Sequence, residues 1–518
     1  MKRIGIDVGG TNTDAALLDG DTVIAAVKTF TTADVTTGVR TALKDVIAKA
    51  SDAATDVVAV MIGTTHFTNA VVERRNLGRA AAVRISLPSS ASLVPFCDWP
   101  KDLAAKVNGG IHLIEGGHEF DGRPLVPMNE RAVAEAARQV VRDGVNAVAI
   151  SATFSPLTAE CEERAAEIFR NEAPDVHVTL SSTLGRIGLL ERENVALMNA
   201  SLIALARDTT KAFVDAVAES GLGAQLYITQ NDGTVVRAEA AREFPVFSFA
   251  SGPTNSMRGA ALLAGIEDAM VCDVGGTTAD IGCLVKGFPR EANNVVQVGG
   301  VRTLFRMPDL LSIAVGGGTK IGRDPLTVGP ESVGYRLGQE ALVFGGSQIT
   351  ATDIAVAAGL ISIGDTARVA HLPKDFVSAA LQKMHDNISV AVDRMKTDAA
   401  PVPLLAVGGG AMLIPQTMPG ISEVIHVEHN GVANAVGAAM AQISGETDRI
   451  YRDMDRDEAI AAARASAIAA AVESGADEAS IKVIDIEDLP LSYLPGRAIR
   501  TRVRVVGEAA ALRRAEPA

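Results

Sequence analysis

Stretches of consecutive apolar residues alternate along the chain with stretches whose apolar residues lie three or four positions apart. Residues 57–62 and 404–407 are continuously apolar, which is typical of strands in a sheet that helices cover on both faces. Residues 37–50 instead place apolar side chains such as Val39 and Leu43 at helical spacing. This alternation predicts an α/β fold.

Two predicted strands end in the same short pattern: an acidic residue, two glycines, a threonine and a second acidic residue. The pattern occupies residues 7–14 and occurs again at residues 273–280. A repeat over such a long separation indicates a duplicated domain. The repeat aligns Asp7 with Asp273, Gly9 with Gly275, Gly10 with Gly276, Thr11 with Thr277 and Asp14 with Asp280.

A glycine-rich turn of this kind is suited to bind phosphate. Glycine lets the backbone approach a ligand closely, and consecutive N–H groups form a concavity that attracts anions. The acidic residue at the strand end suits hydrated Mg²⁺, which prefers oxygen ligands and keeps several waters. Taken singly, each turn is also compatible with an ordinary hairpin. Two copies that face a shared cleft would clamp a nucleotide's phosphates from both sides.

Three other segments carry candidate contacts. The apolar run 404–407 leads directly into Gly408, Gly409 and Gly410, and residues 316–318 form a second glycine run. Thr64 and Thr65 lie in a hydroxyl-rich turn that opens a predicted helix, where an anion or a substrate carbonyl would meet free N–H groups. The alternative for these two threonines is a helix cap.

Composition and charge narrow the class of protein. Hydrophobic residues make up 47% of the chain and aromatic residues only 4%, so the core must consist mainly of Ala, Val, Ile and Leu. A net charge of −14 without a basic run argues against nucleic acid or an anionic membrane as a partner. We expect no transmembrane helix, because no window of about 18 residues is uninterruptedly apolar. The four cysteines include no Cys-x-x-Cys pair, which favours reduced thiols and a cytoplasmic location.

The motifs together resemble those of the actin, sugar-kinase and Hsp70 ATPase superfamily. Within that superfamily the chain is most similar to the A-type proteins of the hydantoinase/5-oxoprolinase family. The similarity spans roughly residues 1–445. It rests on the repeated pattern and on residues 63–74, 192–202, 251–253, 316–318, 329–332 and 350–353.

The resemblance implies two duplicated actin-like, ribonuclease H-like ATPase domains around a central nucleotide cleft. Beyond Gly445 the composition shifts, and residues 449–474 predict an Ala-rich helix followed by strands at 481–486 and 501–506. We therefore expect a small C-terminal α+β appendage. The expected parts are an N-terminal domain at 1–189, a second domain at 190–445 and the appendage at 446–518.

The resemblance also implies ATP and Mg²⁺ as cofactors and a cyclic amide as substrate: a hydantoin, a lactam or a 5-oxoproline-like ring. Phosphorylation of the amide oxygen followed by hydrolysis would open the ring. Because the chain is short for a self-sufficient enzyme of this type, a separate B-type partner subunit is implied. Assembly into a homo-oligomer is compatible with the sequence. The alternatives on the same scaffold are a nucleotide-dependent regulator or activator, a small-molecule kinase and a carboxylase component.

Site residues follow from the resemblance, position by position. Asp7 and Asp273 would organise Mg²⁺, and Gly408, Gly409 and Gly410 would contact the adenosine. Asp14 and Asp280 would orient water or hydroxyl groups, or else hold the hairpins together. The other expected nucleotide contacts are Gly9, Gly10, Thr11, Asn12, Thr13, Thr64, Thr65, Gly275, Gly276, Thr277, Thr278, Gly316 and Gly317.

Overall fold

The structure is a computed structural model of the chain. It describes residues 1–9, 12–30, 35–185, 188–292, 295–492 and 497–510. Two of the predicted phosphate contacts, Gly10 and Thr11, lie outside the described residues.

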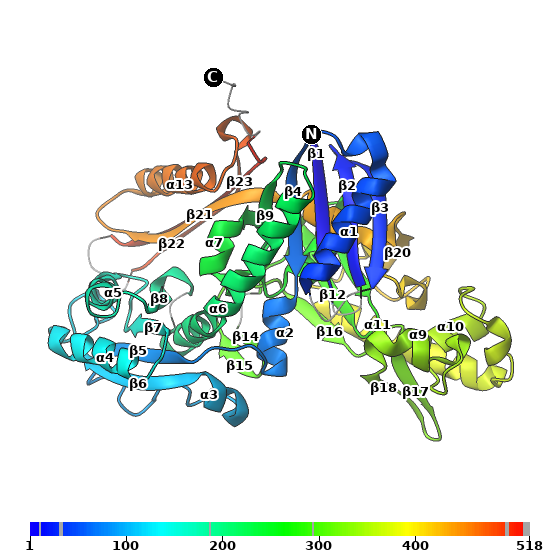
Figure 1. The fold of residues 1–518 in the computed structure, drawn as a ribbon, viewed down its shortest axis with the longest axis horizontal. Helices are drawn as coiled ribbons and strands as arrows, with labels where there is room; N and C mark the ends of the chain where they lie inside the picture. The colour runs from blue at the N-terminus through cyan, green and yellow to red at the C-terminus, as the bar shows by residue number, and fades with distance from the viewer. Residues whose placement is uncertain (10–11, 31–34, 186–187, 293–294, 493–496, 511–518) are drawn as a thin grey trace.

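Among the described residues, a mixed sheet of nine strands runs across the upper part of the molecule, from β22 on the left to β3 on the right of Figure 1. Its strand order is β22-β23-β21-β10-β9-β4-β1-β2-β3. The strands are β1 (Lys2–Val8), β2 (Asn12–Asp19), β3 (Thr22–Phe30), β4 (Val57–Thr64), β9 (Gln225–Thr229), β10 (Thr234–Arg237), β21 (Gln442–Tyr451), β22 (Lys482–Pro490) and β23 (Ile499–Gly507).

A second sheet repeats the central part of the first. In the first sheet β1 pairs antiparallel with β2 and parallel with β4. In the second sheet β11 pairs antiparallel with β12 and parallel with β19. The duplication predicted from the sequence therefore has a structural counterpart. The strands of this sheet are β11 (Ala269–Val274), β12 (Ala279–Val285), β13 (Phe288–Pro289), β16 (Leu310–Ile313), β19 (Val402–Val407) and β20 (Ile421–His426).

Two helices of small residues pack between these sheets. Helix α8 (Ser251–Ala264) and helix α12 (Ala433–Ala439) approach so closely that a Cβ added at Gly437 would lie 1.8 Å from the carbonyl oxygen of Asn255. A Cβ at Gly5 of β1 would lie 2.0 Å from the carbonyl oxygen of Ala435. Real Cβ atoms do not approach so closely, so glycine is required at both crossings.

A third sheet of parallel strands lies beside the first. It has the order β6-β5-β7-β8, and helices α4 (Glu130–Arg142) and α5 (Glu160–Glu172) cover one face. The long helix α6 (Leu189–Glu219) packs on this sheet with its first half and on the first sheet with its second half. The strands are β5 (Ala80–Leu87), β6 (Asn108–Glu115), β7 (Ala147–Ala152) and β8 (His177–Leu180).

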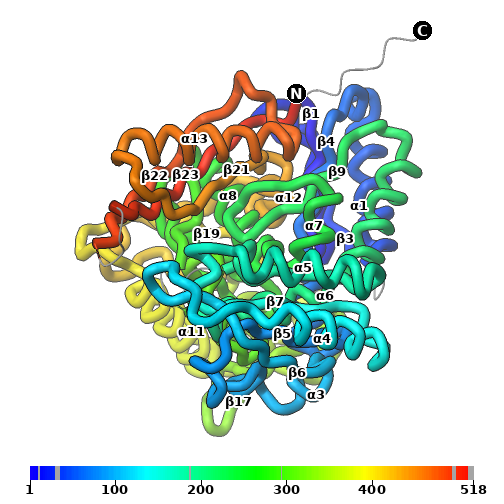
Figure 2. Tube along the Cα trace, turned by 90° about the vertical axis from the view of Figure 1, so that its left-hand side faces the viewer, coloured from blue at the N-terminus to red at the C-terminus, as the bar shows by residue number. Residues whose placement is uncertain are grey.

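The C-terminal elements extend the first sheet. Strand β21 pairs parallel with β10 and antiparallel with β23, and helix α13 (Arg456–Glu473) lies over these strands (Figure 2). The helix begins later than the sequence pattern predicts, because residues 449–451 continue β21 and Asp455 forms a capping box with Glu458. The appendage is thus continuous with the first sheet, and the boundaries at 189 and 445 stay predictions.

Three further helices cover the two central sheets. Helix α1 (Val35–Ala50) packs on the first sheet, and helices α10 (Ala351–Ala357) and α11 (Lys374–Met395) pack on the second. Within the described ranges, every helix is too short or too polar to cross a membrane.

Candidate active site

The two hairpins carry acidic residues at matching positions. Asp7 near the end of β1 lies opposite Asp14 of β2 in the first hairpin. Asp273 of β11 lies opposite Asp280 of β12 in the second hairpin. All four acids were predicted from the sequence, and the structure places each pair at the turn end of its hairpin.

The two turns are closed by the same backbone hydrogen bond. In the first hairpin the N–H of Gly9 donates to the carbonyl of Asn12 at 3.0 Å. In the second hairpin the N–H of Gly275 donates to the carbonyl of Thr278 at 2.9 Å. The repeated sequence therefore folds into the same local geometry twice.

The second turn offers free backbone donors. Among the described residues, none accepts a hydrogen bond from the N–H groups of Gly276 or Thr277. Two consecutive N–H groups of this kind attract an anion such as a phosphate. Their counterparts in the first turn are Gly10 and Thr11, which the structure does not describe.

A glycine on the neighbouring strand lies directly beside each strand-end acid. A Cβ added at Gly63 of β4 would lie 2.7 Å from Asp7 Oδ1. A Cβ added at Gly408, which follows β19, would lie 2.2 Å from Asp273 Oδ1. Gly408 also has φ +88°, a conformation that favours glycine. Larger residues at either position would push into the carboxylate, so the glycines keep space at the acids.

The last glycine run packs against the second hairpin. The N–H of Gly410 donates to the carbonyl of Val274 at 2.7 Å, and the N–H of Gly408 donates to the carbonyl of Asn430 at 3.2 Å. Gly409 is exposed, with open space where a Cβ would stand. This run therefore lies at the edge of the site, where contact with the adenosine of a nucleotide stays a prediction.

Asp7 is buried and held from two sides. The side-chain amide of Asn434 in α12 donates to Asp7 Oδ2 at 3.2 Å, and that of Asn255 in α8 donates to Asp7 Oδ1 at 3.5 Å. The pKa of Asp7 is raised to about 7, chiefly by burial and also by the nearby carboxylates of Asp14 and Asp273, while the two amides lower it. Asn255 thus joins the first hairpin to α8, the helix that leads into the second hairpin.

Asp14 forms the closest ion pair of the site. Lys28 Nζ donates to both carboxylate oxygens of Asp14 at 2.8 Å and to the carbonyl of Gly431 at 2.9 Å. Burial raises the pKa of Asp14, and the ammonium group of Lys28 opposes this rise. Because Gly431 precedes α12, Lys28 ties the first hairpin to the segment that follows the second sheet.

Within the described residues, no lysine or arginine pairs as closely with Asp273 or Asp280. Burial raises the pKa of Asp273, and it raises the pKa of Asp280 to about 6. The hydroxyl of Ser312 in β16 donates to Asp280 Oδ1 and lowers its pKa, whereas the Asp273 carboxylate raises it. Asp280 is therefore a carboxylate that gains and loses a proton near neutral pH.

Gly316 and Gly317 support the second turn from behind. The N–H of Gly317 donates to the carbonyl of Gly275 at 3.0 Å, and the N–H of Gly316 donates to Thr319 Oγ1 at 2.7 Å. A Cβ at Gly316 would lie 2.6 Å from the backbone nitrogen of Thr277. These amides are engaged in holding the turn, and their contact with a nucleotide stays a prediction.

Thr64 and Thr65 have partners in the protein. Thr64 Oγ1 accepts a hydrogen bond from the N–H of His66, the first residue of helix α2 (His66–Glu73), at 3.1 Å. Thr65 Oγ1 accepts one from the side-chain amide of Asn69 at 3.3 Å. The helix cap proposed as the alternative is thus found only in part: Thr65 is the N-cap residue but makes no side-chain capping bond, and Thr64 binds the N–H of the first helical residue. The other predicted contacts differ in exposure: Thr13 is fully buried, whereas Asn12 and Thr278 are half-buried.

The acidic residues of the two hairpins suit Mg²⁺ better than they suit a metal ion that needs three or more protein ligands. Across the described ranges, no three His, Cys, Asp or Glu side chains gather closely enough to bind a metal ion. Mg²⁺ needs only one or two carboxylates beside waters and phosphate oxygens. Asp7 and Asp273 would supply such carboxylates, one from each hairpin.

Two family models match successive parts of the chain. The model of the hydantoinase/oxoprolinase N-terminal region matches residues 3–173, and the hydantoinase/oxoprolinase model matches residues 192–393. The caprolactamase subunit alpha of Pseudomonas jessenii is 28% identical over 70% of this chain and 55% of its own length. The acetophenone carboxylase gamma subunit of Aromatoleum aromaticum is 26% identical over 70% of this chain and 54% of its own length. The chain thus matches little more than half of each of these relatives.

A solved structure shares the fold. The ATP-dependent caprolactamase from Pseudomonas jessenii superposes with a TM-score of 0.75 and 19% identity, covering 100% of this chain and 89% of that one. The likeness shows an α/β fold built from actin-like ATPase-type domains. The fold expected from the sequence is confirmed.

Proposed function

Because the chain belongs to the hydantoinase/oxoprolinase family, we propose that it is the ATP-dependent component of a hydrolase that opens cyclic amides. The substrate class is a hydantoin, a lactam or a 5-oxoproline-like ring. One observation carries the proposal: the chain builds the same acidic, glycine-rich hairpin twice, with Asp7 opposite Asp14 in the first and Asp273 opposite Asp280 in the second. Two acidic, glycine-rich turns that face one site can position a nucleotide's phosphates between them.

The chemistry couples ring opening to ATP. The amide oxygen attacks the terminal phosphorus of ATP, and ADP leaves. Water then adds to the amide carbon, and the carbon–nitrogen bond breaks, so that the ring nitrogen leaves as an amine and an acyl phosphate remains. A second water hydrolyses the acyl phosphate to a carboxylate and inorganic phosphate. Phosphorylation is needed because it makes the unreactive amide carbon electrophilic.

Named side chains have distinct tasks in this proposal. Asp7 and Asp273 would hold Mg²⁺, which would neutralise charge on the phosphates. The free N–H groups of Gly276 and Thr277 would bind phosphate oxygens. Asp280, whose pKa is about 6, is the candidate base that takes a proton from water at neutral pH.

A separate subunit completes the proposal. The caprolactamase and acetophenone carboxylase relatives are both named as subunits, and the chain matches 55% and 54% of their lengths. We therefore propose that a B-type partner receives the phosphorylated ring. The carboxylase relative also favours a second function, in which a ketone enolate is phosphorylated before carboxylation.

Formation of ADP distinguishes these functions, because phosphorylation precedes the step that needs a partner. The full chain is incubated with Mg²⁺ and ATP. One set of reactions receives a cyclic amide, which is hydantoin, ε-caprolactam or 5-oxoproline. The other set receives acetophenone with bicarbonate. We expect a cyclic amide to stimulate ADP formation and Asp273→Asn to abolish the stimulation. Stimulation by the ketone alone would favour the carboxylase function. A stable phosphorylated product would indicate a kinase, and nucleotide binding without stimulation would indicate a regulator.

A further inference from the structure

Helix α8 packs against both central sheets and carries two buried polar side chains next to each other. Asn255 and Ser256 are both 0% exposed. Asn255 Oδ1 and Ser256 Oγ have no hydrogen-bond partner among the described residues. Because buried polar atoms are almost always paired, two such oxygens in consecutive residues indicate a place for a bound group. We propose that Asn255 and Ser256 are positioning residues that hold water molecules of a hydrated Mg²⁺ between Asp7 and Asp273. The inference rests on the proposed function, which needs Mg²⁺ at these two acids.

Asn255 reaches the first hairpin. Its side-chain nitrogen lies 3.5 Å from Asp7 Oδ1 and 3.1 Å from Thr229 Oγ1. A Cβ added at Gly63 would lie 2.2 Å from this nitrogen, so the glycine leaves the space that the amide occupies. A carboxylate only accepts hydrogen bonds, and the amide therefore turns its nitrogen toward Asp7. The amide oxygen is left as an acceptor beside the first strand-end acid.

Ser256 reaches the second hairpin. Consecutive residues of an α-helix point about 100° apart, so this side chain can meet a different strand from that of Asn255. Its hydroxyl faces Asp273 of β11 and lowers the pKa of that carboxylate. The next residue, Met257, packs on β12, where a Cβ added at Gly282 would lie 2.8 Å from its sulfur. A single turn of α8 thus serves the strand-end acids of both hairpins.

The hydrogen-bonding capacity of the two oxygens selects the bound group. A water on Mg²⁺ directs a lone pair to the metal and donates both hydrogens, which suits an acceptor such as Asn255 Oδ1. Ser256 Oγ can donate to Asp273 and still accept from such a water. A phosphate oxygen has no hydrogen to donate, and the carboxylates of Asp7 and Asp273 would repel it. The α8 side of the site therefore suits the water shell of a cation, and the phosphates belong at the glycine turns.

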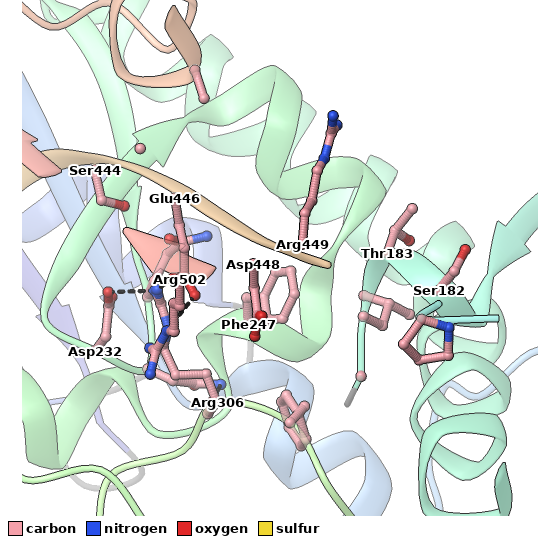
Figure 3. Close-up of a pocket in the computed structure, with 18 of the residues that line it drawn as sticks. Ser182, Thr183, Asp232, Phe247, Arg306, Ser444, Glu446, Asp448, Arg449 and Arg502 are labelled. Carbon is pink, nitrogen blue, oxygen red and sulfur yellow. Dashed lines mark hydrogen bonds and ion pairs between the residues drawn. The ribbon is translucent and has the colours of Figure 1, made fainter. Parts of the chain in front are cut away.

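The start of α8 is fixed from a neighbouring cavity. The cavity has a volume of about 620 Å³, and Asp232 and Arg306 lie on its wall (Figure 3). These two side chains satisfy each other, since Arg306 Nη1 donates to Asp232 Oδ2 at 2.7 Å. Asn231 Oδ1 accepts the N–H of Ala250 at 2.8 Å, and its carbonyl accepts the hydroxyl of Thr254 at 2.9 Å. Asn231 thus anchors the turn of α8 that leads directly into the two positioning residues.

Helix α6 provides matched controls for the two residues of α8. Asn199 and Ser201 are also an asparagine and a serine buried on one helix, and Asn199 Oδ1 likewise lacks a partner within the described chain. Their hydrogen bonds stay within α6 and the third sheet. Asn199 donates to Thr179 Oγ1 at 3.3 Å, and Ser201 donates to the carbonyl of Met198 at 2.8 Å. Loss of a buried amide or hydroxyl as such is therefore measured apart from the hairpins.

Calorimetry with the full chain measures ATP affinity with Mg²⁺ present and with Mg²⁺ chelated. We expect Asn255→Ala and Ser256→Ala each to weaken the Mg²⁺-dependent affinity at least about tenfold. Asn199→Ala and Ser201→Ala should change it less than about twofold. ATP affinity without Mg²⁺ should be the same in all four variants. Titration of Mn²⁺ into the ATP-saturated chain, followed by the electron paramagnetic resonance signal of free Mn²⁺, should give the same order of metal affinity.

Thermal unfolding distinguishes this role from a structural one. Removal of a hydroxyl that has no partner in the described chain costs little stability, so Ser256→Ala should unfold at the wild-type temperature without Mg²⁺. Mg²⁺ and ATP together should then stabilise Ser256→Ala less than the wild type. If the α8 variants bind Mg²⁺–ATP as tightly as the α6 variants, the positioning role is wrong and the proposed function stands. If Mg²⁺ does not affect ATP binding by the wild type, both are wrong.

Discussion

In the first hairpin Asp14 lies opposite Lys28 of β3, whereas in the second hairpin Asp280 lies opposite Ser312 of β16. The strand positions correspond, but the chemistry does not. Lys28 binds both oxygens of Asp14 and holds it as an ion, while Ser312 gives Asp280 one hydrogen bond and no charge. Duplication has thus kept the backbone and separated the roles of these two acids: Asp14 is held in an ion pair, and Asp280 is held by one hydroxyl group.

The largest expected effect concerns Asp7. Its folded-state pKa of about 7 lies above the value of about 3.9 for an unfolded chain. Protonation of Asp7 therefore contributes to the free energy of unfolding. This contribution is fully present below about pH 4 and is lost as the pH rises through about 7. The asparagine of Asp7→Asn has no proton to lose. From pH 4 to pH 8 the unfolding free energy of the variant should therefore rise by about 2 to 4 kcal/mol relative to that of the wild type. Urea unfolding of both proteins across this range measures it; parallel pH profiles would contradict it.

Lys28 should matter more than its counterpart Ser312. Lys28→Met leaves the buried Asp14 carboxylate without its cation, which should cost about 1 to 2 kcal/mol of stability, since Lys28 is partly exposed. Ser312→Ala removes a single hydrogen bond and should cost about 0.5 to 1 kcal/mol. Thermal unfolding compares the two variants. Equal losses would mean that the two hairpins do not differ in the way described.

The smallest expected effect sharpens the role of Asp280. If Asp280 is the base, cyclic-amide-stimulated ADP formation should rise with pH through about 6. Ser312→Lys would place a cation where the first hairpin has one and should shift this rise by about one pH unit downward. The pH profile of the rate provides the test. If the midpoint of the pH–rate profile is the same in Ser312→Lys and the wild type, Asp280 is not the base and has a structural role in the hairpin.

The sequence was sufficient for the hairpins, because each is encoded within one short segment. It was insufficient for the residues that complete the site. Asn434 stands 427 positions from the Asp7 that it contacts, and Lys28 and Asn255 likewise come from other segments. A motif within one segment carries no signal for partners that only the packing of α8 and α12 brings together.

The Ala-rich C-terminal segment shows a second limit. Its composition predicts helix from residue 449, yet residues 449–451 belong to β21. The Ala-rich composition begins only beyond these residues, whereas Ile450 and Tyr451 are types that favour strands, and pairing with β23 satisfies their backbone. Tertiary context therefore decided the boundary, and the Asp455 cap marks where the helix begins.

The central claim is that both hairpins bind one Mg²⁺–nucleotide complex, and calorimetry of ATP binding with and without Mg²⁺ tests it most directly. We predict that Asp7→Ala and Asp273→Ala each lower the Mg²⁺-dependent affinity at least about tenfold, and that the difference disappears when Mg²⁺ is chelated. Asp21→Ala, at the exposed turn between β2 and β3, should bind like the wild type. Loss in only one of the two hairpin variants, or wild-type binding that ignores Mg²⁺, would contradict a shared site.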